Sequence, residues 1–280
     1  MAHGFDPGPV EEPFASLARD YPGADVYPPA DFRVEWGPIF HRGRLDGSAR
    51  VVVLGQDPGQ HESFVRRILV GEAGQRVQGF LAKLGVDRSY AMVNTFLYSV
   101  YGQGGGERHW DDEAIAAYRH RWLDALLGAG SGVEIVVAFG HLADRAWGRW
   151  RQTEVGGASD ATYVHLTHPT APDSSSQGDP AKRAEAMRKM LAEWNQGLDV
   201  LHPALQHPDR EIPLAHYGED LVDADLAPIP EDDLPAGLPP WMRSLKTWAK
   251  RAGADTETKR ATLVVTVPSD ERPWNHGGTT

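Results

Sequence analysis

The sequence predicts an α/β fold, a three-layer α/β/α sandwich built on a four-stranded parallel sheet. Between residues 48 and 197, apolar runs rich in β-branched residues alternate with stretches of helical period. Two of these runs, Val51–Leu54 and Ile135–Phe139, are apolar at every position. Such continuous apolar runs are typical of strands that are buried on both faces of a parallel sheet.

Each expected strand is rich in β-branched or aromatic residues, and the helices between them have recognisable ends. The four strands are Ala49–Leu54, Tyr90–Phe96, Val133–Phe139 and Thr162–Thr167. One helix is expected to begin at Asp112 and to stop at Gly128. Asp179 followed by Pro180 predicts the start of a later helix, which ends at Gly197.

The composition changes on both sides of this segment. Residues 1–47 are rich in Pro and Gly and are expected to form an N-terminal arm with one short helix, Glu12–Arg19. Residues 48–197 are the main domain. Residues 198–280 are an acidic, Pro-rich C-terminal extension that we expect to pack on it. Within the extension, Trp241–Arg251 is expected to be a helix and Leu263–Val267 a strand.

The composition excludes several classes of protein. The chain of 280 residues is 41% hydrophobic and 24% charged, as in ordinary soluble globular proteins. It has no cysteine, which excludes disulfides, iron–sulfur clusters, thiolate zinc sites and a cysteine nucleophile. It has neither the pattern of a signal peptide nor an apolar run of about 18 residues, so we expect a cytoplasmic protein without a membrane partner.

The net charge of −11 argues mildly against a nucleic-acid partner, but it is unevenly distributed. Residues 209–233 alone carry a net charge of −8, which leaves −3 for the rest and room for a local basic face. His165 and His168 lie three apart on a strand, so they would not share a face, and no metal-binding motif occurs. We expect a monomer with no metal and no cofactor.

Open α/β sheets bind ligands at the carboxyl ends of their strands. The first strand is followed by GQDPG, which contains Asp57, and the second contains Asn94 near its end. Gly140 and His141 follow the third strand, and His168 follows the fourth. Each residue alone is as well explained as a turn, cap or loop residue. Their combination, in this order, predicts an active edge.

These segments resemble motifs of the uracil-DNA glycosylase superfamily. VVVLGQDPGQHE resembles its first motif, and Gln-Asp-Pro matches the branch in which that motif reads GQDPYH. MVNTF resembles that branch's uracil-reading segment, VVAFGHLA its third-strand segment and HLTHPTAPDS its closing motif. Residues 67–74 resemble a segment of the thermophilic branch whose iron–sulfur cluster requires four cysteines. The chain is therefore a mosaic, which suggests a separate branch.

The resemblance implies a monofunctional hydrolase that removes uracil from DNA and leaves an abasic site for base-excision repair. Because the target bond lies inside the base stack, the deoxyuridine must flip out. The resemblance assigns Asp57 to the sugar cation and the attacking water, and His168 to uracil O2, with backbone N–H groups near Gln56. It assigns base reading to Asn94, whose amide can pair with O4 and N3–H of uracil but not with cytosine.

Two further substrate-binding positions depart from the GQDPYH branch. Gly59 replaces the tyrosine that sterically excludes the thymine methyl group, so discrimination against thymine either comes from elsewhere or is weaker. Leu69 aligns with the phenylalanine that stacks on uracil, and it supplies an apolar floor without a π face.

The closing loop offers candidate contacts to DNA. It lacks the branch's bulky leucine wedge, which leaves Ala171 and Pro172 as the apolar residues that could enter the base stack. Thr170 and Ser174 are candidate phosphate contacts. Basic residues that could meet phosphate are Arg66, Arg67, Arg76, Lys182 and Arg183, with a second patch at Lys246, Lys250, Arg251, Lys259 and Arg260.

The segment Gly102–Trp110 is expected to be a loop, either flexible or in contact with DNA through Arg108. His109 follows Asn94 by 15 residues. This position is comparable to that of a histidine in the X-type members of the superfamily, which crosslinks to the abasic site. Trapping of the product by His109 is therefore a hypothesis. A mass-shift assay with abasic DNA that shows no adduct would exclude it.

Two other interpretations stay open. One is a binding protein for abasic or damaged DNA, with tight or covalent retention of the product. The other is a hydrolase of small nucleosides, which the acidic net charge mildly favours. Salt dependence discriminates them, because DNA binding weakens steeply as salt rises.

Overall fold

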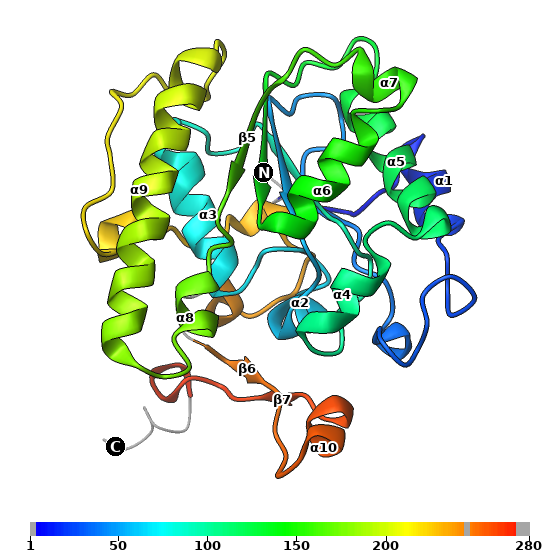
Figure 1. Ribbon diagram of the computed structural model, residues 1–280, viewed down its shortest axis with the longest axis vertical. Helices are drawn as coiled ribbons and strands as arrows, with labels where there is room; N and C mark the ends of the chain where they lie inside the picture. Colours follow the sequence, from blue (N-terminus) through cyan, green and yellow to red (C-terminus); the bar gives the residue numbers. More distant parts are fainter. Residues whose placement is uncertain (1–3, 244–246, 273–280) are drawn as a thin grey trace, which may run out of the picture.

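The computed structural model describes residues 4–243 and 247–272, and its centre is a mixed five-stranded sheet (Figure 1). The strand order is β1-β3-β2-β4-β5, and the last four of these run parallel. The parallel strands are β2 (Val51–Gly55), β3 (Tyr90–Asn94), β4 (Ile135–Phe139) and β5 (Thr162–Leu166). The expected α/β fold and its four parallel strands are confirmed.

The fifth strand, β1 (His41–Gly43), adds an antiparallel edge, with His41 opposite Val93. It lies in the segment that we expected to be an arm. Three residues of sequence HRG give no β-like pattern. The pairing with β3 therefore places them in the sheet, and the local sequence could not predict it.

Helices cover both faces of the sheet, which gives the expected three layers. Alternate side chains of β2 enter the two cores: Val52 faces one helical layer and Val53 the other. One layer contains α1 (Phe14–Arg19), α5 (Glu113–Leu127) and α6 (His141–Trp150), and the other contains α3 (Glu72–Lys83) and α9 (Pro180–Ala204). Among the described residues, no helix is long and apolar enough to cross a membrane.

The remaining elements are short. The helices are α2 (Gln60–Val65), α4 (Gln103–His109), α7 (Glu154–Gly157), α8 (Ala171–Ser175) and α10 (Thr256–Ala261). The strands β6 (Ala249–Lys250) and β7 (Val264–Val265) form a separate antiparallel pair. The 3-10 helices are Val34–Trp36, Asp223–Asp225, Glu231–Asp233, Pro240–Arg243 and Ser269–Glu271.

The last long helix, α9, begins as predicted but ends later. The Asp179 side chain caps it by accepting hydrogen bonds from the N–H groups of Ala181 and Lys182. Gly197 does not end it. A Cβ there would lie 2.8 Å from Leu166 Cδ2, so this glycine lets α9 approach β5 closely. The helix continues to Ala204.

Two other expectations about local structure are wrong. Gly102–Trp110 is mostly the helix α4 and not a loop. Trp241–Arg251 is not one helix: a 3-10 turn ends at Arg243, residues 244–246 lie outside the described residues, and β6 follows. The buried Trp248 and Ala249 pack in one cluster with Val65 of α2, and this contact overrides the helical period. The strand expected over Leu263–Val267 is confirmed in part by β7.

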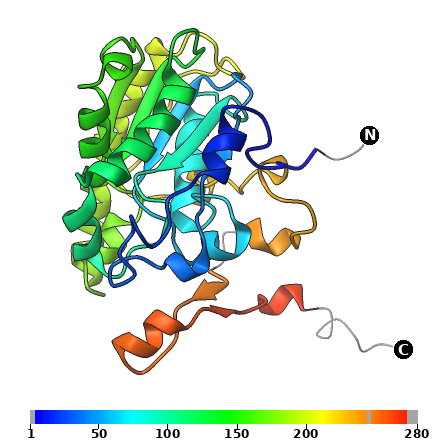
Figure 2. The same cartoon turned by 90° about the vertical axis from the view of Figure 1, so that its right-hand side faces the viewer.

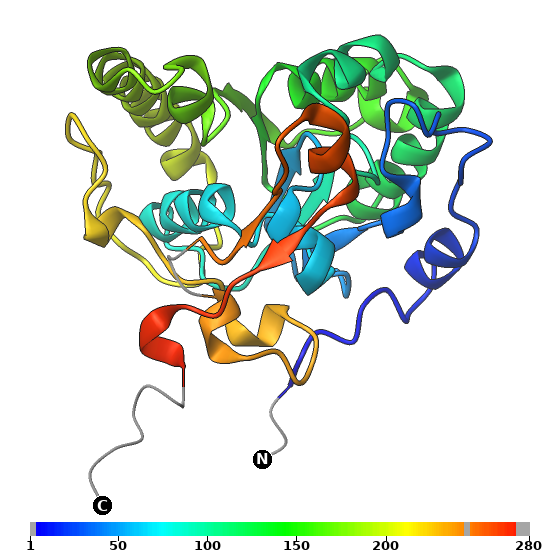
Figure 3. The same cartoon turned by 90° about the horizontal axis from the view of Figure 1, so that it is seen from below.

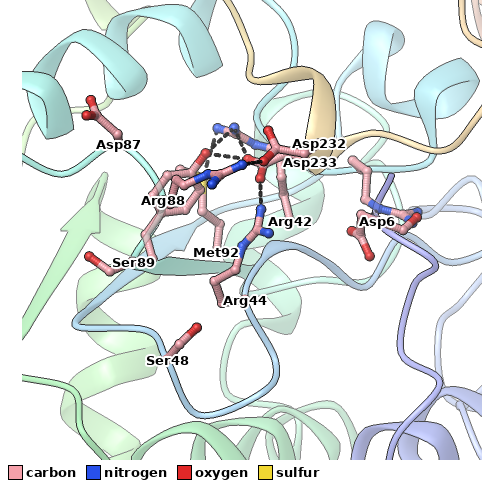
Figure 4. A network of polar contacts seen from close by, with 12 residues as sticks. Asp6, Arg42, Arg44, Ser48, Asp87, Arg88, Ser89, Met92, Asp232 and Asp233 are labelled. Atoms are coloured by element: carbon pink, nitrogen blue, oxygen red, sulfur yellow. Dashed lines mark hydrogen bonds and ion pairs between the residues drawn. The ribbon is translucent and has the colours of Figure 1, made fainter. Parts of the chain in front are cut away.

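Acidic residues of the extension after α9 attach it to the main domain through hydrogen bonds and ion pairs. The carboxylate of Asp209 accepts hydrogen bonds from the N–H groups of residues 87–89, and Asp225 pairs with Lys83 at 2.8 Å. Asp233 is buried and meets both Arg42, at 3.0 Å, and Arg44 (Figure 4). Several charges of the −8 segment are therefore engaged in internal contacts.

The chain then turns below the sheet (Figure 2). There β6, α10 and β7 lie at the end of the molecule where α8 follows β5, beside the carboxyl ends of the strands (Figures 1 and 3). We call residues 247–267 the C-terminal hairpin.

Candidate active site

The carboxyl edge of the sheet has one topological switch point. The chain passes from β2 to its neighbour β3 and then crosses to β4 on the other side of β2. Ligands of open α/β sheets bind at such a point. Gln56 follows β2 there, and its Oε1 accepts a hydrogen bond from the N–H of Leu142 at 3.4 Å, behind β4.

Asp57 is held at this edge by one backbone group. Its Oδ2 accepts a hydrogen bond from the N–H of Val100 at 3.0 Å, in the loop after β3. The pKa of Asp57 is raised to about 6, chiefly by burial. The hydrogen bond from Val100 lowers the pKa, and the nearby Glu62 carboxylate raises it. The carboxylate is therefore ionised near neutral pH but holds its negative charge at a cost in free energy.

Asn94 ends β3, directly opposite Gly55 of β2. The Asn94 amide lies against Gly55 so closely that a Cβ on Gly55 would collide with Asn94 Oδ1. Leu69 Cδ1 would lie 3.9 Å from the same Cβ, so the amide and the apolar side chain share one site above Gly55. Leu69 is 7% exposed and has a left-handed backbone, with φ of 52°. The structure thus brings together the amide and the apolar surface that the sequence predicts.

His168 follows β5, and its tautomer is fixed by its neighbour. The backbone N–H of Thr170 donates to His168 Nδ1 at 3.3 Å, and Thr170 Oγ1 lies 3.2 Å from the same nitrogen. Since Nδ1 accepts, the proton of the neutral ring is on Nε2. Burial lowers the pKa of His168 to about 4, and the nearby Arg76 guanidinium lowers it further. The ring is neutral at physiological pH and can donate from Nε2.

Arg76 organises the loop that carries His168. Its side chain is 3% exposed, and it donates to the carbonyl of Pro169 at 2.5 Å and to Asp173 at 2.8 Å. The sequence grouped Arg76 with the phosphate contacts, but its donors point into the protein. Arg183 likewise pairs with Asp173 at 2.6 Å, and Arg67 pairs with Asp6 at 2.5 Å.

The space over Gly59 is not open. A Cβ on Gly59 would lie 2.8 Å from Glu62 Oε2, so the Glu62 carboxylate occupies the position next to this glycine. Glu62 is 7% exposed, and its other oxygen accepts a hydrogen bond from the N–H of Val70 at 3.1 Å. Glu62 lies within the first motif, yet sequence reasoning missed it. Its position three residues after Gly59, on α2, was the signal that could have found it.

The closing loop folds into the short helix α8. Pro172 is buried, so it is not available to enter a base stack, and Ala171 is half-buried. The Ser174 hydroxyl donates to the carbonyls of Thr170 and Ala171, at 3.2 and 3.1 Å. The backbone N–H of Thr170 donates to His168 Nδ1. These residues are thus organised around the histidine, with Ser174 exposed beside them.

His109, at the end of α4, has both ring nitrogens hydrogen-bonded to carboxylates. Nδ1 lies 2.6 Å from Asp112 and Nε2 lies 2.9 Å from Asp31. Burial lowers the pKa of His109, but the two hydrogen bonds outweigh it and raise the pKa above its usual value. Both ring nitrogens are engaged by carboxylates, so neither is free to attack an abasic sugar. Arg108 pairs with Asp31 and remains more than half exposed.

This edge therefore combines an ionised carboxylate, a neutral N–H donor and an amide above an apolar side chain. Together these groups suit cleavage of a bond that leaves a cation on one fragment and an anion on the other. Within the described residues, no group of three His, Asp or Glu side chains is placed to hold a metal.

One of the comparisons with known proteins gave a match. Curated proteins gave no match to the chain. The family model of the uracil DNA glycosylase superfamily matches residues 42–195, which include four of the five strands in full and nearly all of β1. The match covers more than half of the chain, and the function of the protein is accordingly of the DNA glycosylase type. The chain belongs to the uracil DNA glycosylase superfamily.

Proposed function

We propose that this protein is a monofunctional uracil-DNA glycosylase. It hydrolyses the N-glycosidic bond of a flipped-out deoxyuridine and leaves an abasic site, as the first step of base-excision repair. It acts as a cytoplasmic monomer on uracil-containing DNA. The observation that carries the proposal is the geometry of the two ionisable groups at the sheet edge: the Val100 N–H holds the Asp57 carboxylate, and the Thr170 N–H occupies His168 Nδ1 and leaves Nε2 to donate.

The chemistry needs this combination of charges. As the bond breaks, positive charge develops on the sugar and negative charge on uracil. The Asp57 carboxylate stabilises the sugar cation and orients the attacking water, while His168 Nε2–H donates to uracil O2. A neutral histidine avoids placing a second positive charge beside the sugar cation. The Thr170 hydrogen bond supports this role because it holds the proton on Nε2.

The base is recognised by Asn94 and Leu69. The amide pairs with O4 and N3–H of uracil, and cytosine would leave both groups unpaired. Leu69, beside the amide, supplies the apolar surface under the ring. The Glu62 carboxylate next to Gly59 supplies the bulk that a tyrosine would otherwise give, and so replaces it as the barrier to the thymine methyl group.

A single-turnover assay tests the proposal. A labelled duplex with one uracil, and a matched duplex with thymine, are incubated with excess protein, and strand scission is scored after alkali. We expect cleavage of the uracil strand and none of the thymine strand. Tight binding without cleavage would overturn the proposal in favour of a DNA-binding protein. Cleavage of free deoxyuridine alone would overturn it in favour of a nucleoside hydrolase.

The structure does not favour covalent retention of the product. His109 is the residue that the resemblance suggests for it, and both of its ring nitrogens are hydrogen-bonded to carboxylates. We therefore expect no mass shift when the protein is incubated with uracil-containing DNA.

A further inference from the structure

The C-terminal hairpin lies outside the segment matched by the family model, yet it is fastened to the active edge. Trp248 is 2% exposed and packs edge-on against His61 of α2, with ring centroids 4.7 Å apart. Phe64 of the same helix also contacts Trp248, at 6.1 Å. Since α2 follows the Asp57 loop directly, the hairpin is attached to the helix that begins at the catalytic motif.

A second attachment reaches the loop that holds Asp57. Arg251 of the hairpin donates to Ser99 Oγ at 3.0 Å, one residue before the Val100 N–H that binds Asp57. In addition, Arg33 donates to the backbone carbonyl of Arg260 at 2.5 Å. The hairpin therefore contacts the loop after β3 through Ser99, and it contacts Arg33, whose backbone N–H donates to the Ser99 carbonyl of the same loop.

Three arginines gather at this junction around two aromatic rings. The Arg33 guanidinium lies 4.9 Å from the Trp36 ring centre and 4.1 Å from that of Tyr101. Arg251 lies 5.3 Å from Trp36, and Arg260 lies 4.8 Å from Tyr101. We call these three arginines with Trp36 and Tyr101 the guanidinium cluster. Aromatic faces attract such cations but do not neutralise them.

The arginines of this cluster have no ion pairs of their own. Within residues 4–243 and 247–272, none of the three forms an ion pair with a carboxylate, whereas the buried Arg42, Arg67 and Arg76 do. The carboxylate of Glu35 lies beside the cluster and accepts a hydrogen bond from the Tyr101 hydroxyl at 2.9 Å. In the same part of the chain, Arg33 Nε and Arg251 Nη1 are buried and have no hydrogen-bond acceptor. Lys250 and Lys259 are exposed on the hairpin, and residues 247–267 carry a net charge of +2 in a chain of −11.

We propose that the C-terminal hairpin and the guanidinium cluster bind the phosphates of the DNA strand that carries the target nucleotide. The exposed Lys250, Lys259 and Arg260 would donate hydrogen bonds to phosphate oxygens along the strand, and the less exposed guanidinium groups of Arg33 and Arg251 would add positive charge behind them. Because the cluster adjoins the Val100–Asp57 hydrogen bond, binding there places the backbone next to the catalytic carboxylate. This inference rests on DNA being the substrate.

Salt-dependent binding to DNA tests it. The double variant Lys259→Ala/Arg260→Ala changes two exposed side chains on α10 and leaves the Arg260 carbonyl that binds Arg33. Affinity for a uracil-containing duplex is measured by fluorescence anisotropy between 50 and 200 mM salt. Because the variant removes two cations that meet phosphate, the slope of log K against log salt should become less steep by about 2, and Kd at low salt should rise about tenfold or more.

The matched control is Arg121→Ala, which removes an exposed arginine from α5, outside the hairpin and the cluster. We expect it to leave the salt slope unchanged. An unchanged slope in the double variant would overturn the proposal, and so would tighter binding, which would make the hairpin a barrier to DNA. Failure of the proposed function is distinguishable: a wild-type protein that does not cleave uracil, while the double variant still weakens DNA binding, refutes the glycosylase and retains the phosphate-binding hairpin.

Discussion

Two regions of this molecule bury ionisable side chains, and they differ in whether the charges are paired. At the β1 edge, Arg42 and Asp233 are 0% and 1% exposed and pair at 3.0 Å (Figure 4). The Arg42 guanidinium also donates to Gln78 and to the Tyr90 hydroxyl. At the carboxyl edge, Asp57 is bound by one backbone N–H, and within the described residues it has no cation in ion-pair contact. In the first region opposite charges attach the extension, whereas in the second region one carboxylate has no ion-pair partner within the described residues.

The difference shows how to separate structural from functional charge in this chain. A buried pair with further hydrogen bonds satisfies both of its members, so neither has a reason to react. An isolated buried carboxylate has a shifted pKa, and such shifts gather at active sites. By the same criterion, Arg67 and Arg76 are structural, whereas the arginines of the guanidinium cluster have no carboxylate in ion-pair contact within the described residues.

The largest effect is expected from breaking the pair at the β1 edge. Asp233→Asn leaves Arg42 buried beside a neutral partner, and we expect unfolding free energy to fall by about 3–5 kcal/mol. Urea denaturation measures it. The matched control is the adjacent Asp232→Asn, whose partner Arg88 is 71% exposed, with an expected loss below about 1 kcal/mol. Equal losses in the two variants would contradict the comparison.

The next effect concerns catalysis at the carboxyl edge. Asp57→Ala and His168→Ala should each lower the single-turnover rate of uracil removal by at least about 10²-fold. Lys189→Ala, on the exposed face of α9, is the control and should keep the normal rate. Near-normal rates in both site variants would show that the reaction takes place elsewhere.

A smaller effect, of opposite sign to that at Asp233, is expected for the stability of Asp57→Asn. The pKa of Asp57 is raised to about 6, so the folded protein holds a proton that the unfolded chain releases between its ordinary carboxyl pKa and pH 6. Stability is therefore lost as pH rises through this window. Asparagine removes that cost and should stabilise the protein by about 1–2 kcal/mol at pH 7.5, after allowance for partial exposure. The gain in unfolding free energy should disappear near pH 4. Denaturation at pH 4 and at pH 7.5 measures it. A less stable variant at pH 7.5 would refute the view that the Asp57 charge is unpaired.

The smallest effect is a shift in the pH profile. Uracil removal should decline as pH falls through about 6, because Asp57 then gains a proton. Glu62 contributes to the raised pKa, so Glu62→Gln should move this decline to lower pH. Single-turnover rates between pH 5 and 8 give the profiles of the wild-type protein and of the variant. Matched duplexes with thymine test whether the glutamine still excludes thymine beside Gly59. Coincident profiles would remove Glu62 from the electrostatics of the site.

The sequence predicted the elements whose pattern agrees with their burial. The parallel strands were predictable because Val51–Gly55 and Ile135–Phe139 are buried on both faces. The strand β1 was not, since it depends on pairing with β3, and neither was the structure around Trp248, which depends on packing against α2. Likewise, the strand ends predicted Asp57, Asn94 and His168 at one edge, whereas Glu62, Val100 and Arg33 reach it through tertiary contacts.

The pairing of Arg42 with Asp233 also constrains how this protein can change over evolutionary time. Arg42 opens the segment that the family model matches, and Asp233 lies well beyond its end at residue 195. Removal of the extension would take away the carboxylate that pairs with Arg42, and replacement of Arg42 alone would leave Asp233 paired only with Arg44. We therefore expect changes at the two positions to depend on each other, although 191 positions of the chain separate them.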